Sequence, residues 1–92
     1  MNTTGDQRLP EASLLNFLSG LGSQGLMQLG AMTNPQTGEL SVNLPFARYT
    51  VQLLRVFEEK TAGNRSADED QYLSGIIADL EARLAQAEAA AG

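Results

Sequence analysis

The chain has 92 residues, 42% of them hydrophobic, and a formal charge of −5, so it is large enough for one small domain and no more. It contains no cysteine and no histidine, which excludes disulfides and thiolate metal sites and removes the commonest general base. The acidic balance argues against binding nucleic acid or anionic lipid through a broad basic face.

The sequence pattern predicts a flexible tail over residues 1–9, one helical domain over 10–88 and a frayed end over 89–92. The first ten residues lack the basic start and apolar core of a signal peptide. The 27 residues from Ala12 to Gly38 contain no ionisable side chain, but they include no run of about 18 apolar residues, so no membrane span is predicted. We therefore expect a soluble, cytoplasmic protein.

The first helix is expected over about 11–31, starting near Pro10 or Glu11. At 100° per residue, one apolar face collects Leu14, Leu18, Leu21, Leu29 and Met32, extended by Leu15 and Leu26. Gly22 and Gly25 lie near the centre of that face. A glycine costs a helix roughly 1 kcal/mol relative to alanine. Glycines within an apolar stripe therefore predict that another backbone approaches closely.

Gly20, Gly22 and Gly25 also spell G-x-G-x-x-G, the pattern of dinucleotide-binding loops. That motif needs a strand before the glycines and an acidic residue about 20 positions after them. Here the preceding segment has helical periodicity and no acid stands in the right place. The G-x-x-G loop of KH domains, which Gly22 to Gly25 also fits, requires nearby positive charge that this segment lacks. No cofactor is predicted.

The connection over residues 33–43 begins with a strong turn signal at Asn34–Gly38, and Leu40 and Val42 then alternate with polar residues. A short extended piece there is left open. Asn43 should cap a second helix over about 44–61. Its apolar face is predicted to contain Phe46, Tyr49, Leu53, Val56 and Phe57, widened by Ala47, Thr50 and Leu54. Arg48, Gln52, Arg55 and Glu59 form the opposite face, and Gly63 follows the helix end.

Ser66 and Glu69 form a capping box that opens a third helix over about 67–88. Its narrow stripe, with 4-3-4-3 spacing, contains Leu73, Ile77, Leu80, Leu84 and Ala87, flanked by Ile76. Two heptads suit packing against one partner helix. The acidic run Asp68–Asp70 is interpreted as favourable charge in a first helical turn and not as a metal site.

Candidates for chemistry are few. Arg48 and Arg55 lie seven residues apart and could clamp an anion, although a solvated face with Arg55 near Glu59 is the plainer interpretation. Gln24 and Gln28 could bind a ligand or hydrogen-bond across a subunit interface. The single lysine, Lys60, belongs to a polar helix end, and no histidine can activate a serine or threonine. No catalytic, cofactor-binding or metal-binding residue is nominated, so we do not expect an enzyme.

The chain resembles a bacterial family of unknown function numbered 1844, from about Leu14 to Arg83. The residues that carry the resemblance are Ser23-Gln24, Leu26–Gly30, Asn34-Pro35, Thr37-Gly38, Asn43-Leu44, Ala47, Thr50, Glu59–Thr61 and Gly63-Asn64, with "EEKTAGN" the most specific run. The resemblance implies a short helical cytoplasmic protein and no established activity. Family members often have alanine in place of Gly22 and Gly25, which fits close packing, and an apolar residue in place of Arg65.

Together these observations predict an all-α protein of three helices, joined by a Pro/Gly connection and assembled as a homo-oligomer, most simply a C2 dimer. A monomer of this size could hardly cover all the apolar faces. The interface is expected at Leu14, Leu18, Leu21, Gly22, Gly25 and Leu29, and contacts to a ligand or partner at Gln24, Gln28, Arg48 and Tyr49. The leading functional hypothesis is a non-enzymatic protein-interaction or scaffold module. The alternatives are a small-ligand or regulatory protein with a pocket between subunits, and an accessory subunit of an enzyme.

Overall fold

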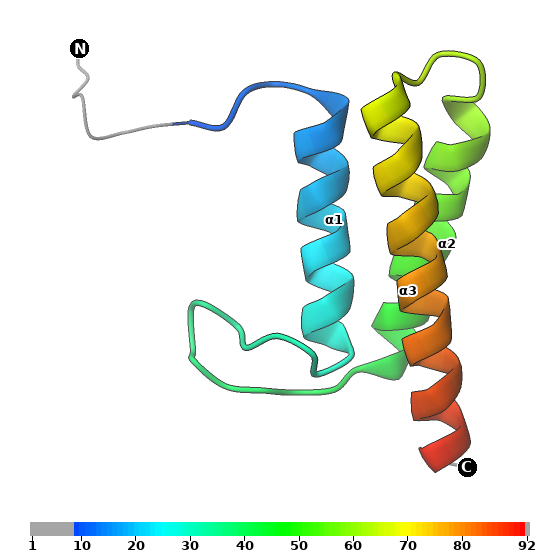
Figure 1. Ribbon diagram of the computed structural model, residues 1–92. Helices are drawn as coiled ribbons and strands as arrows, with labels where there is room; N and C mark the ends of the chain where they lie inside the picture. Colours follow the sequence, from blue (N-terminus) through cyan, green and yellow to red (C-terminus); the bar gives the residue numbers. More distant parts are fainter. Residues whose placement is uncertain (1–8, 92) are drawn as a thin grey trace.

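A computed structural model describes residues 9–91, which form three helices: α1 (Leu14–Gln28), α2 (Leu44–Lys60) and α3 (Ala67–Ala91). Each helix packs against both others, and consecutive helices run in opposite directions (Figure 1). The predicted all-α fold is confirmed. The expected N-terminal tail lies outside the described residues, except for Leu9.

The ends of α1 are set by local hydrogen bonds. The Ser13 hydroxyl accepts a hydrogen bond of 3.1 Å from the Asn16 amide, so α1 starts at Leu14 and not at Glu11 as predicted. At the other end Gly30 has a φ of +74°, and Ala31 N–H donates to the Leu26 carbonyl at 2.8 Å. This Schellman-type closure ends the helix before the predicted position at 31.

The connection from α1 to α2 swings out as a wide loop (Figure 1). Asn34 organises its turn, because its side-chain oxygen accepts from Gln36 N–H at 2.8 Å and its carbonyl accepts from Gly38 N–H at 2.7 Å. Val42 forms an isolated antiparallel bridge with Leu29. The extended piece that the sequence left open is therefore a single bridge, which fastens the end of the loop to the end of α1.

The other predicted caps are present. The Asn43 side chain accepts from Phe46 N–H at 3.2 Å and begins α2. In the capping box, the Ser66 hydroxyl accepts from Glu69 N–H and the Glu69 carboxylate accepts from Ser66 N–H. The helix that follows continues to Ala91, beyond the predicted end at 88, because its last residues are mostly alanine.

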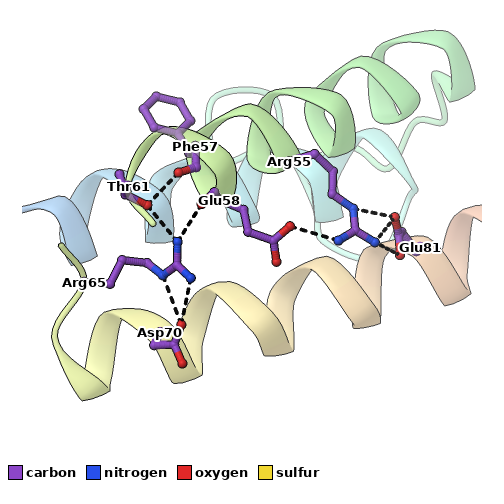
Figure 2. A network of polar contacts seen from close by, with 7 residues as sticks. All are labelled: Arg55, Phe57, Glu58, Thr61, Arg65, Asp70 and Glu81. Carbon is purple, nitrogen blue, oxygen red and sulfur yellow. Dashed lines mark hydrogen bonds and ion pairs between the residues drawn. The ribbon is translucent and has the colours of Figure 1, made fainter. Parts of the chain in front are cut away.

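Arg65 ties the end of α2 to the start of α3, as Figure 2 shows. Its guanidinium donates to the main-chain carbonyl of Glu58 at 2.7 Å and to the Thr61 hydroxyl at 3.0 Å, and it pairs with the Asp70 carboxylate at 3.0 Å. The C-terminal carbonyls of a helix lack intrahelical partners, so this side chain acts as a cap for α2.

The core lies between the three helices. Its buried hydrophobic residues are Leu18, Ala47, Val51, Leu54, Leu73, Ile77, Leu80 and Leu84. The predicted stripe of α3 is confirmed: four of its five residues are buried, and Ala87 is half-buried.

The sequence predicted the buried face of α2 wrongly, because the centre of that face lies at other residues than expected. The smaller residues Ala47, Thr50 and Leu54, expected at the margin, are buried, whereas Phe46 and Tyr49, expected inside, are mainly exposed. The apolar arc of α2 is wider than its two neighbours can cover. The covered part contains Ala47 and Thr50, whose small side chains let α1 and α3 approach the α2 backbone, together with Val51 and Leu54.

Candidate interaction surface

Gly22 and Gly25 are close-packing residues, as predicted, but their partners belong to the same chain. A Cβ at Gly22 would overlap the Tyr72 hydroxyl, and a Cβ at Gly25 would come 2.9 Å from Leu80 Cδ1. Both neighbours are on α3. These two glycines therefore allow α3 to lie close to α1, which corrects the prediction that they meet a second copy.

The leucines assigned to the subunit interface also serve the chain's own core. Leu18 is fully buried, and Leu14, Leu21 and Leu29 are half-buried against the core. The apolar face of α1 is thus largely covered by α2 and α3. The self-association of the chain stays a prediction, and a surface through which two copies could meet must lie outside the covered face of α1.

Gly20 differs from the other two glycines of α1. It is exposed, and a Cβ built on it would meet nothing within 4 Å among residues 9–91. Two residues correspond to 200° of helical rotation, so Gly20 lies on nearly the opposite side of α1 from Gly22. Packing within the chain gives no reason for this glycine.

A groove of about 620 Å³ lies between the second half of α1, the 33–43 loop and the start of α2. The helices contribute Gly20, Gln24, Met27, Gln28 and Phe46 to its walls. The loop contributes Asn34, Pro35, Gln36, Glu39, Ser41 and Asn43. The walls are a mixture of neutral amides and apolar atoms with a single carboxylate.

The structure separates the four predicted contact residues. Gln24 and Gln28 both line the groove, but the Gln28 side-chain oxygen accepts a hydrogen bond of 2.6 Å from the buried Thr50 hydroxyl. Tyr49 lines a shallower neighbouring hollow of about 260 Å³ with Pro45 and Phe46. Arg48 points elsewhere and pairs with Glu88 on α3.

Further apolar side chains are exposed on α2 and α1. Phe46, Tyr49 and Val56 on α2 and Phe17 on α1 are between 48% and 58% exposed. The Phe17 ring also packs against the Phe57 ring in a tilted arrangement, with ring centroids 5.2 Å apart, which joins the two helices. We call Phe17, Gly20, Gln24, Phe46, Tyr49 and Val56 the α1–α2 face. In the sequence, the helical spacing of Phe46, Tyr49 and Val56 was the only indication of this face. The same spacing is also typical of a buried core stripe, so it could not identify an exposed surface.

Charge is segregated between the helices. Residues 14–28 of α1 carry no ionisable side chain, whereas α2 carries three basic and two acidic ones. The α3 helix contains one arginine, Arg83, and six carboxylates: Asp68, Glu69, Asp70, Asp79, Glu81 and Glu88. Its net charge of −5 equals the formal charge of the whole chain. No member of the α1–α2 face is an Asp, Glu, Lys or Arg residue.

The arginines of α2 face α3 and not the groove. Arg55 pairs with Glu58 at 3.0 Å and with Glu81 at 2.9 Å, as Figure 2 shows. Its hydrogen bonds to Glu58 and then to Glu81 raise the pKa of Arg55 above its ordinary value. Stabilisation from a raised basic pKa is lost only as pH rises through that pKa, so this group gives no pH dependence near neutrality. The anion clamp of Arg48 and Arg55 that the sequence left possible is not formed, because each arginine is paired with carboxylates. Arg55 pairs with Glu58 and Glu81 and not with Glu59, the neighbour given to it by the plainer interpretation.

Two of the three acidic side chains at the start of α3 form contacts that stabilise the fold. Glu69 belongs to the capping box and Asp70 pairs with Arg65. Within residues 9–91, no group of three acidic side chains is arranged to hold a metal ion. None of the three helices in this part of the chain combines the length and apolar character that crossing a bilayer needs.

A family model described as "Domain of unknown function (DUF1844)" matches residues 11–86, which span α1, α2 and most of α3. The chain belongs to this family. Its three-helix core, the groove and every residue of the α1–α2 face thus lie within the DUF1844 region. No curated protein and no solved structure matched the chain. The function of this DUF1844 protein has therefore to be argued from its own surface.

Proposed function

We propose that the protein is a non-enzymatic interaction module that self-associates and contacts other proteins through the α1–α2 face. The observation that carries the proposal is the exposure of Phe46, Tyr49 and Val56 on one helix, where Phe46 also lines the open groove. Clusters of exposed apolar side chains mark interaction sites in small proteins. Aromatic residues are also the side chains most enriched at the centres of interfaces.

The chemistry of the chain supports a role without catalysis. The sequence has no histidine or cysteine. Its four helix-associated arginines, Arg48, Arg55, Arg65 and Arg83, each form an ion pair with a carboxylate of the same chain. The groove walls carry amides, the Glu39 carboxylate and the Ser41 hydroxyl, and the sequence has no histidine that could activate that hydroxyl.

The test is the molar mass by light scattering over a range of micromolar concentrations. The wild-type chain should show a mass above that of one chain that rises with concentration. Val56→Glu places a charge in the exposed apolar stripe and should shift the mass toward the monomer. Gln86→Glu adds the same charge to the exposed surface of α3 and should leave the mass unchanged. A single-chain mass for the wild type at every concentration would contradict self-association.

A second candidate function is small-ligand binding in the groove. Its volume of about 620 Å³ falls in the range of ligand pockets, and the exposed Gln24 amide offers both a donor and an acceptor. A thermal-shift screen of neutral polar metabolites tests this candidate, because a ligand that binds only the folded chain raises the melting temperature. The Gln24→Ala variant should lose any such shift.

A further inference from the structure

We propose that a second copy of this chain packs its own α1 across Gly20, so that the two α1 helices cross on a two-fold axis between Gly20 and Gln24. This inference rests on the proposed function, since it names the occupant and the geometry of the α1–α2 face. The sequence placed the crossing of the two helices at Gly22 and Gly25, but α3 of the same chain fills the space beside both residues. Gly20 is the one glycine within α1 that the fold leaves open.

Gly20 is the first observation. A glycine within a helix is less stable than an alanine, so it is retained at a cost unless something needs the missing side chain. Gly22 and Gly25 have such a reason inside the chain, because side chains of α3 fill the space above them. Among the described residues nothing lies within 4 Å above Gly20, and the same is true of Gly75 on α3, but of the two only Gly20 forms part of the groove wall. The backbone of another helix can therefore approach α1 most closely at this point.

Gln24 is the second observation. It is exposed one turn after Gly20 and lines the same groove. A primary amide carries a donor and an acceptor, so two glutamines related by a two-fold axis can exchange a pair of hydrogen bonds. A two-fold interface is self-complementary in this way, because each surface meets its own copy. Phe17 and Phe46, which are exposed on either side of this point, supply the apolar area around the crossing.

The distribution of charge selects a second copy as the occupant. Like copies of a chain with a charge of −5 repel one another unless their charged surfaces stay apart. Gly22 and Gly25 direct α3 to the side of α1 away from Gly20, and α3 carries the whole net charge. Copies that meet at Gly20 therefore bury helix surface without charged side chains, with Glu39 the one carboxylate of the adjoining groove, and hold the two acidic helices on the outside. A basic partner would be attracted to α3 and not to this face.

Gly20→Leu tests the crossing, with Gly75→Leu as a matched control. Both glycines are exposed, lie inside a helix and have nothing within 4 Å of the added Cβ, so neither change should unfold the chain. Gly20→Leu should raise the dissociation constant of the dimer about tenfold or more, since the side chain obstructs the helix contact. Gly75→Leu should leave that constant unchanged. A Gly20→Leu variant that dimerises like wild type would overturn the crossing.

Cross-linking gives a second and independent readout, because the chain has no cysteine of its own. Gln24→Cys treated with a short bifunctional maleimide should give a covalent dimer in high yield. Ala82→Cys, exposed on α3, should not. If light scattering shows a dimer but Gln24→Cys does not cross-link, the crossing is wrong and the proposed function stands. A wild-type chain that stays monomeric overturns both.

Discussion

Leu80 of α3 lies directly over Gly25 of α1. A Cβ at position 25 would come 2.9 Å from Leu80 Cδ1 and 3.3 Å from Thr50 Cγ2, so all three helices meet at this one missing side chain. Leu80 is fully buried there. The distance between α1 and α3 is therefore set by the absence of a side chain on α1.

Gly25→Leu should destabilise the fold by about 2–3 kcal/mol, because a large side chain cannot enter a packed core without moving its neighbours. Gly25→Ala should be close to neutral. The tips of Leu80 can shift by a few tenths of an ångström, and alanine gains roughly 1 kcal/mol of helix propensity. Urea unfolding of the two variants measures both effects. Equal midpoints for Gly25→Leu and wild type would show that α1 does not pack on Leu80.

Thr50→Val should cost about 1 kcal/mol, which is the usual value for a lost intramolecular hydrogen bond. Thr50 is 2% exposed, and its hydroxyl donates to Gln28 at 2.6 Å, joining α2 to the last turn of α1. Valine keeps the shape, so the effect isolates the hydrogen bond. A double-mutant cycle with Gln28→Ala should give a coupling energy of the same size. Additive effects would mean that the two side chains do not interact.

Arg65→Ala should destabilise the chain by about 1–3 kcal/mol, because hydrogen bonds to charged groups are stronger than neutral ones and this side chain is only 17% exposed. Arg65→Lys should recover part of the loss, since an ammonium cannot reproduce the fork that reaches Glu58 and Asp70 together. Arg83→Ala is the control: its pair with Asp79 is exposed on one helix and should contribute under about 0.5 kcal/mol. Thermal unfolding at two salt concentrations separates the buried cap from screened surface charge.

Ser66→Ala should destabilise α3 by about 1 kcal/mol through loss of the capping box. Its hydroxyl accepts the Glu69 amide at 3.1 Å, and the Glu69 carboxylate accepts the Ser66 amide at 2.7 Å. Hydrogen exchange should then speed up selectively in the first turn of α3. Ser74→Ala, exposed within the same helix, should not reduce stability, and a matching loss there would argue against a specific cap.

The local features of this protein follow from its sequence because they depend on neighbours within a few residues. Asn43, Ser66 and Glu69 cap helices by bonding to amides three positions away, and the stripe from Leu73 to Leu84 repeats at the period of one helix face. Gly22 and Gly25 likewise predicted close packing, since only a near neighbour explains glycine in an apolar stripe.

Tertiary structure alone decided which neighbour each apolar surface meets. Nothing in the pattern distinguishes α3 of the same chain from α1 of another copy as the partner of Gly25, because either could fill the same space. Nor does the pattern show which half of the wide apolar arc of α2 is covered. Two neighbouring helices can bury Ala47 and Leu54 or Phe46 and Tyr49, but not both pairs, and the close approach at the α1 glycines favours the smaller side chains.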